Sequence, residues 1–214
     1  MTALIKRDYT EGEEIANSLT HAVGAGLAIA GLAVLLVLAA RTGGAERIVS
    51  AAVYGSALVL LYAGSAFYHT PRGGRLRTVA QAIDHAMIYV LIAATYTPFS
   101  LITLKGPWGY GIMAVVWSLA VFGIVREIVS KKKSRVVTVL LCLAMGWTVV
   151  VAINPLLRSL PAGGFALLLA GGLAYTAGTI FYALKRVPYM HTVWHLFVIG
   201  GSVLHFLAVA LYVA

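Results

Sequence analysis

The chain contains little charge and almost no cysteine. Only 11% of its 214 residues are Asp, Glu, Lys or Arg, whereas 61% are hydrophobic, and the mean hydropathy is +0.92. A soluble domain of this size needs a charged surface, so the composition favours a protein that is embedded in lipid. Cys142 is the single cysteine, which excludes an intrachain disulfide and with it the disulfide-rich secreted domains.

Acidic residues are also scarce, with 7 Asp and Glu against 16 Lys and Arg and a formal charge of +9. The basic residues fall in short clusters between apolar runs and form no aromatic-studded patch, so we expect no nucleic-acid partner. The first apolar run follows a mixed-charge segment and has no clear small-residue cleavage site. It therefore predicts a retained helix, not a cleaved signal peptide.

Seven apolar segments are long enough to cross a bilayer, which requires about 20 residues per helix. Cutting the chain at its charges and its Gly/Pro clusters gives spans at 18–40, 48–69, 79–103, 108–129, 136–157, 163–184 and 191–213. Pro98 is expected to kink or end the third helix. The sequence predicts an all-α, polytopic membrane protein: an N-terminal segment over residues 1–17 and a seven-transmembrane helix bundle over 18–214.

Lys and Arg are distributed unevenly between the two sides of this bundle. With the N-terminus inside, 12 of the 16 basic residues lie on the cytoplasmic side. The bias predicts a cytoplasmic N-terminus and a C-terminus outside. We therefore expect a multi-pass protein of the cell membrane, surrounded by membrane lipids and with no predicted soluble partner.

All six histidines fall in or at the ends of the predicted helices, where ionisable groups are costly and usually functional. Five of them lie near the predicted cytoplasmic face: His21, His69, His85, His191 and His195. His191 and His195 are four residues apart, so a helix places both imidazoles on one face, about 6 Å from each other. This spacing suits two ligands of one metal; a coincidental polar helix end is the alternative.

A third histidine and a carboxylate come from other spans. His69 closes the second span, and Ser65 lies one turn earlier, where its hydroxyl can orient the ligand or a bound water. Asp84 is the only acidic residue that this interpretation places inside a span near this face, where an unpaired carboxylate costs about 2–3 kcal/mol or more. Three histidines with an open fourth position are typical of catalytic zinc. We expect one Zn²⁺ per chain on His69, His191 and His195, with Asp84 as general base for a water in the fourth position.

The other polar positions near this face have two interpretations each. Glu14, Asn17 and His21 share one helix face, and they either line the cytoplasmic mouth of the site or, with Asn17 as cap, merely begin the helix. His85 points about 100° away from its neighbour Asp84, which favours support or packing over ligation. His205 lies too far along the last helix to share the metal, and we expect it to hydrogen-bond between helices.

Together these motifs resemble the hemolysin III proteins, the bacterial branch of the progestin and adipoQ receptor superfamily. The resemblance covers nearly the whole chain. It rests on Glu14, Asn17 and His21, on Ser65 to His69, on Asp84 and His85 leading to Thr95 to Phe99, and on His191 to His195 with Gly200, Gly201 and His205. It implies zinc held by His69, His191 and His195, Asp84 in contact with the zinc-bound water, and Ser65 as the family serine.

The resemblance leaves three functions open. Adiponectin-receptor relatives are linked to hydrolysis of ceramide amide bonds, and bacterial members carry a haemolysin label and are connected with membrane-lipid homeostasis. The chain is therefore expected to be a zinc-dependent hydrolase of lipid amide or ester bonds, a cytolytic pore-former, or a receptor or lipid sensor with a structural metal. A pore fits poorly, because the polar residues are concentrated at one end of the spans.

Overall fold

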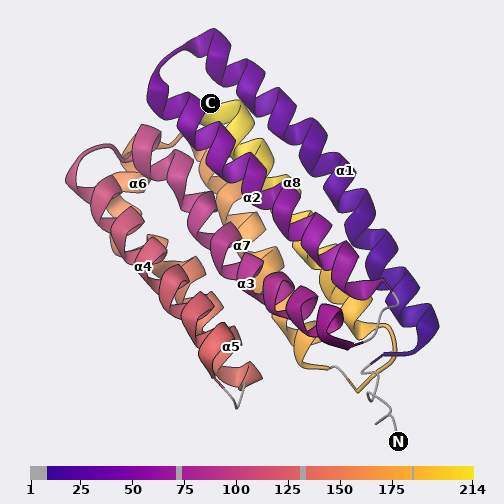
Figure 1. The fold of residues 1–214 in the computed structure, drawn as a ribbon. Helices are drawn as coiled ribbons and strands as arrows, with labels where there is room; N and C mark the ends of the chain where they lie inside the picture. The colour runs from indigo at the N-terminus through magenta and orange to yellow at the C-terminus, as the bar shows by residue number, and fades with distance from the viewer. Residues whose placement is uncertain (1–8, 71–73, 131–133, 185) are drawn as a thin grey trace, which may run out of the picture.

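The structure is a computed structural model that describes residues 9–70, 74–130, 134–184 and 186–214. Seven helical spans are long and apolar enough to cross a membrane, and the described residues contain no strand. Successive spans run in opposite directions, so the start of the first helix and the C-terminus lie at opposite ends of the bundle (Figure 1). The predicted seven-helix, all-α membrane fold is confirmed. Residues 1–8 of the predicted N-terminal segment and the charged connections at 71–73, 131–133 and 185 lie outside the described residues.

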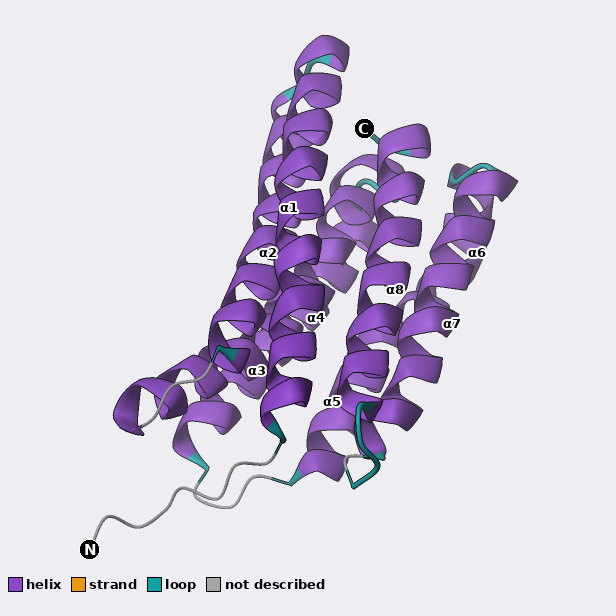
Figure 2. Ribbon diagram, turned by 90° about the vertical axis from the view of Figure 1, so that its right-hand side faces the viewer, coloured by secondary structure: helices purple, strands orange, loops and turns teal. Residues whose placement is uncertain are grey.

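The spans agree with the predicted ranges but differ at their ends and in the middle of the fifth. The first four are α1 (Glu11–Thr42), α2 (Ala45–His69), α3 (Gly74–Pro98) with its π-helical continuation η1 (Phe99–Thr103), and α4 (Pro107–Val129). The fifth consists of α5 (Arg135–Trp147), the 3₁₀ segment η2 (Thr148–Ala152) and α6 (Ile153–Ser159), and the last two are α7 (Ala162–Ala183) and α8 (Met190–Tyr212). Figure 2 shows the spans side by side along the bundle. As predicted, α-helical geometry in the third span ends at Pro98.

Helix α1 begins at Glu11, well before the predicted residue 18, because a capping box fixes its first turn. The Thr10 side chain accepts a hydrogen bond from the Glu13 backbone N–H (3.3 Å), and the Glu13 carboxylate accepts one from the Thr10 N–H (2.9 Å). Asn17 is therefore an interior residue of α1, and the interpretation of Asn17 as a helix cap is wrong. The added turns carry the polar face of α1 into the bundle.

The fifth span is not the single helix predicted over 136–157. Tyr96 of α3 inserts its hydroxyl into the backbone there: it donates to the carbonyls of Gly146 (2.6 Å) and Met145 (2.9 Å) and accepts from the Val149 N–H (3.1 Å). A side chain that replaces backbone partners breaks the regular α-helical hydrogen-bond ladder. The interruption follows from a contact between helices that lie far apart in sequence.

Large apolar side chains cover the outside of the bundle, as lipid requires. Leu19, Val121 and Val151 are 64%, 58% and 71% exposed. Many of the buried polar side chains gather at the end of the bundle where α1 and α8 begin and α2 ends, which we call the histidine end. This end also carries the start of α3 and of α5 (Figure 1).

Replacing Tyr96 by Phe tests the link between the third and fifth spans. The substitution leaves the Val149 N–H without its partner and removes a donor from two carbonyls, so we expect the free energy of unfolding to fall by about 1–3 kcal/mol. Reversible unfolding in detergent, followed by circular dichroism, measures the change. Tyr110→Phe, at an exposed position on α4, is the control; equal stability of the two variants would contradict this account of the break.

Candidate metal centre

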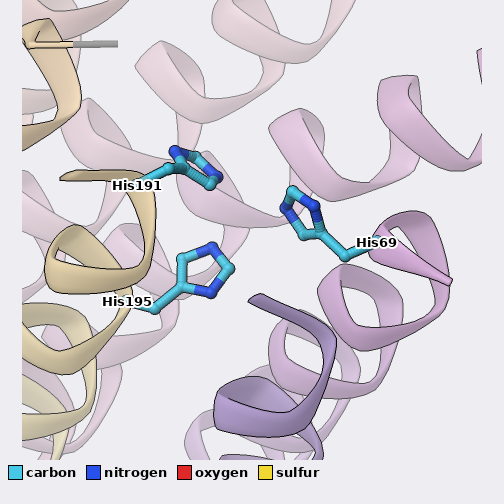
Figure 3. A group of neighbouring side chains, drawn as sticks. All are labelled: His69, His191 and His195. Atoms are coloured by element: carbon cyan, nitrogen blue, oxygen red, sulfur yellow. The ribbon is translucent and has the colours of Figure 1, made fainter. Parts of the chain in front are cut away.

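Three histidines from two helices meet at the histidine end of the bundle. His69 is the last residue of α2, and His191 and His195 lie one turn apart at the start of α8 (Figure 3). Each offers one ligand atom, and these atoms all lie within 4.8 Å of one another. Nitrogens on one tetrahedral zinc are about 3.4 Å apart, so a small rotation of the rings closes the group on an ion. The structure therefore brings together the three residues expected to bind metal.

The start of α8 is fixed by the extended first turn of α1. Tyr189, in a left-handed conformation (φ 61°), precedes α8, and its backbone N–H donates to the Glu13 carboxylate at 2.9 Å. Thr192 donates its hydroxyl hydrogen to the side-chain oxygen of Asn17 at 2.6 Å. These two contacts set the position of the first turn of α8, and hence of His191, relative to α1.

Hydrogen bonds from α1 prepare two of the rings for a metal. His69 Nδ1 donates to the Glu14 carboxylate at 2.7 Å, and His195 Nδ1 donates to the Asn17 backbone carbonyl at 3.2 Å. Because a carboxylate and a carbonyl only accept, both Nδ1 atoms carry a proton, and in the neutral rings that bind metal each Nε2 atom presents a lone pair. His69 Nε2 is buried and has no protein partner, which a metal ion would supply. The donor set thus fits the expected ion.

Glu14 is itself held by a third helix. Its second carboxylate oxygen accepts from the Arg77 guanidinium of α3, and the Arg77 side chain also lies over the Tyr68 ring, 5.2 Å from its centre. Glu14 is 2% exposed and His69 is 0% exposed. Both Glu14 and Asn17 therefore contact histidines of the candidate metal centre, which is a closer position than the predicted lining of the cytoplasmic mouth.

Two more rings pack against the three histidines. His21 stacks on His195 with ring centres 3.5 Å apart and an interplanar angle of 13°, and neither of its ring nitrogens has a hydrogen-bond partner. Tyr9 stacks on His191, with centres 5.0 Å apart. Sequence reasoning missed Tyr9, because a lone tyrosine before the first apolar run carries no periodicity or motif.

Asp84 and Ser65 lie next to the histidines without joining the ligand group. The Asp84 carboxylate lies near the Ser65 hydroxyl and interacts electrostatically with His69 and His85. Both residues, together with His191 and His195, line a cavity of about 240 Å³. The structure thus places Asp84 and Ser65 in the wall of the cavity that His191 and His195 also line, and their catalytic roles stay a prediction.

Asp84 is not the only acidic residue inside a span near this face, so that expectation is wrong. Glu127 of α4 is 2% exposed, and its carboxylate accepts from His85 Nδ1 at 2.9 Å. Glu127 lies close to the charged end of its span and was not singled out from the sequence. His85 consequently faces α4.

His205 donates from Nε2 to the Leu168 carbonyl of α7 at 3.0 Å, which confirms the predicted hydrogen bond between helices.

These features define a polytopic membrane protein with seven helical spans and a buried three-histidine centre at one end. The chain matches the family described as Haemolysin-III related over residues 9–206, and it belongs to that family.

Its relatives match over nearly their full length. "Hemolysin-3" of Bacillus cereus is 43% identical over 201 residues, which cover 94% of this chain and 92% of the relative. "Hemolysin-3 homolog" of Bacillus subtilis is 44% identical over 204 residues, 95% and 96% of the two chains. "Monocyte to macrophage differentiation factor" of Homo sapiens is 30% identical over 203 residues, 92% and 83% of the two chains. The resemblance stated from the motifs is therefore confirmed.

Glu14→Gln tests the support that α1 gives to His69. The amide keeps the shape of the side chain but loses its charge and its pair with Arg77, so we expect metal affinity to fall by about 10- to 100-fold. Competition with a chromophoric chelator measures that affinity. Glu46→Gln, at an exposed position in the first turn of α2, should bind metal as the wild type does. Unchanged affinity in a folded Glu14→Gln protein would contradict the assigned role.

Proposed function

We propose that this protein is a zinc-dependent hydrolase of lipid amide or ester bonds with a role in membrane-lipid homeostasis. One observation carries the proposal: His191 and His195 of the three-histidine group line a largely apolar cavity inside a membrane-spanning bundle, together with Asp84 and Ser65. A metal centre beside a carboxylate provides hydrolytic chemistry, and an apolar cavity provides room for an acyl chain.

The cavity is elongated along the bundle. At the histidine end its wall includes Asp84 and His191, and toward the other end it includes Phe99 and Phe165. A lipid with its acyl linkage at the histidines would lay its chain along this apolar wall. Such walls do not favour a water-filled pore, which needs polar residues along its length, so we do not propose a pore-forming function.

The expected metal is zinc, because an imidazole-rich site favours zinc over magnesium or calcium. Bound zinc polarises a carbonyl and lowers the pKa of water toward about 7. Structural zinc sites are usually closed by four protein ligands. Among the described residues the group contains three, His69, His191 and His195, which supports a catalytic site over a purely structural one.

The chain's own residues would perform the proton transfers and the positioning. Asp84 is the group that accepts a proton from the attacking water and passes it to the leaving amine or alkoxide. Ser65, whose hydroxyl lies near the Asp84 carboxylate, would orient that carboxylate. Glu14 and the Asn17 carbonyl keep the rings of His69 and His195 in the ligating tautomer.

The same proposal places the reaction at the cytoplasmic face of the membrane. The histidine end is the end at which the first described helix begins (Figure 1), and the bias of basic residues favours that end inside. The lipid would then be taken from the inner leaflet.

Asp84→Asn separates catalysis from metal binding. We expect it to lower the rate of fatty-acid release from acyl lipids by about 10²- to 10⁴-fold, because an amide cannot accept the proton. Zinc content should stay at the wild-type level. Mass spectrometry of the released fatty acid, with the protein in nanodiscs, measures the rate, and Glu11→Gln at the exposed start of α1 is the control. Full activity in Asp84→Asn, or in chelator-treated wild type, would refute the proposal.

A further inference from the structure

Two side chains in the cavity wall take no part in the site described above. Arg135 is the first residue of α5, and Tyr182 lies in the last turn of α7. Both line the cavity, and Arg135 is the one Lys or Arg among the described residues that does so. Arg135 is exposed and also lines this largely apolar cavity, so its permanent positive charge is open to an anionic group that enters the cavity.

Tyr182 connects this charge to the histidines. Its ring centre lies 6.1 Å from that of His191 and 5.5 Å from that of Trp194. Arg135 lines the same cavity and is among the charged groups that lie near the Tyr182 hydroxyl. The Tyr182 side chain therefore lies between the Arg135 side of the cavity and the three-histidine group.

Two neighbouring arginines serve the fold instead. Arg77 binds the Glu14 carboxylate, and Arg126 donates to the Thr138 hydroxyl (3.2 Å) and the Ser134 carbonyl (3.3 Å). Neither lines the cavity. Among these three side chains, Arg135 is the one positioned to meet a molecule inside the cavity.

The cavity wall carries two charged side chains among the described residues, the carboxylate of Asp84 and the guanidinium of Arg135. Asp84 is the one carboxylate among the lining residues, and it interacts with the histidine His69 and the hydroxyl of Ser65. Arg135 is the permanent cation in this wall, and its guanidinium forms paired hydrogen bonds with phosphate oxygens. The Tyr182 hydroxyl can donate one more hydrogen bond to the same anion.

We propose that Arg135 and Tyr182 form a subsite for the phosphate of a glycerophospholipid whose acyl ester lies at the three-histidine group. In such a lipid the phosphate and an acyl ester are attached to neighbouring glycerol carbons, which matches the short separation of Tyr182 from His191. The inference rests on the proposed function and narrows its substrate class to anionic acyl esters, as opposed to uncharged sphingoid amides.

Binding measurements on the full-length protein test this subsite without requiring turnover. Native mass spectrometry of detergent-solubilised protein would compare phosphatidylglycerol with a diacylglycerol of the same acyl chains. We expect the wild type to bind phosphatidylglycerol more tightly. Arg135→Gln should weaken that binding by about 10-fold or more, because it removes a charge-assisted hydrogen-bonding partner, and should leave diacylglycerol binding unchanged.

Two further variants show whether the subsite is specific. Tyr182→Phe should weaken phosphatidylglycerol binding by a smaller factor, and Arg135→Lys should restore part of what Arg135→Gln loses. Arg75→Gln is the matched control, because Arg75 is exposed at the same end, on α3, and does not line the cavity. An equal loss in Arg75→Gln would mean general attraction of anionic lipid to a basic surface, and would overturn the subsite.

The remaining outcomes separate the possible ligands and the two proposals. Equal affinity for phosphatidylglycerol and diacylglycerol would refute the subsite, and displacement of the lipid by inorganic phosphate of comparable affinity would refute its assignment to a lipid. Selective, Arg135-dependent binding by a protein that releases no fatty acid would overturn the hydrolase function and leave the subsite standing. Hydrolysis that proceeds equally on uncharged and anionic lipids would overturn the subsite and leave the hydrolase function standing.

Discussion

The hydrogen bond between Glu14 and His69 is the interaction on which the histidine end of this bundle depends. A carboxylate buried in a membrane protein is costly unless it is paired, and Glu14 is paired twice, with His69 of α2 and Arg77 of α3. One side chain of α1 therefore joins three helices. The same contact places the proton on His69 Nδ1 and leaves Nε2, which has no protein partner, free to bind a metal.

The rest of the site follows from that constraint. The capping box at Thr10 and Glu13 extends α1 far enough to bring Glu14 and Asn17 to the ligand histidines, and Glu13 also holds the turn before α8. Several buried polar groups at this end bond to one another, so the candidate metal position and the polar part of the cavity are built together. The rest of the cavity wall is apolar because the helices carry apolar side chains both where they face lipid and where they face one another.

Much of this arrangement can be predicted from the sequence, and the failures have physical causes. Span length and the four-residue spacing of His191 and His195 are local properties, so the fold and the ligand pair follow directly. The early start of α1 also had a local signal, because Thr10 and Glu13 form a capping-box pattern. The break that Tyr96 makes in the fifth span, the His85–Glu127 pair and the stacking of Tyr9 on His191 are contacts between distant segments. No periodicity in a single sequence records them.

The metal content of the purified protein tests the central claim most directly. Elemental mass spectrometry of the wild type should find about one zinc per chain, and His191→Ala and His195→Ala should lose it. His205→Ala is the matched control, since His205 is a buried histidine of the same helix that bonds to Leu168 of α7, and it should keep its zinc. A folded wild type without metal, or a His195→Ala protein with full zinc content, would contradict the account.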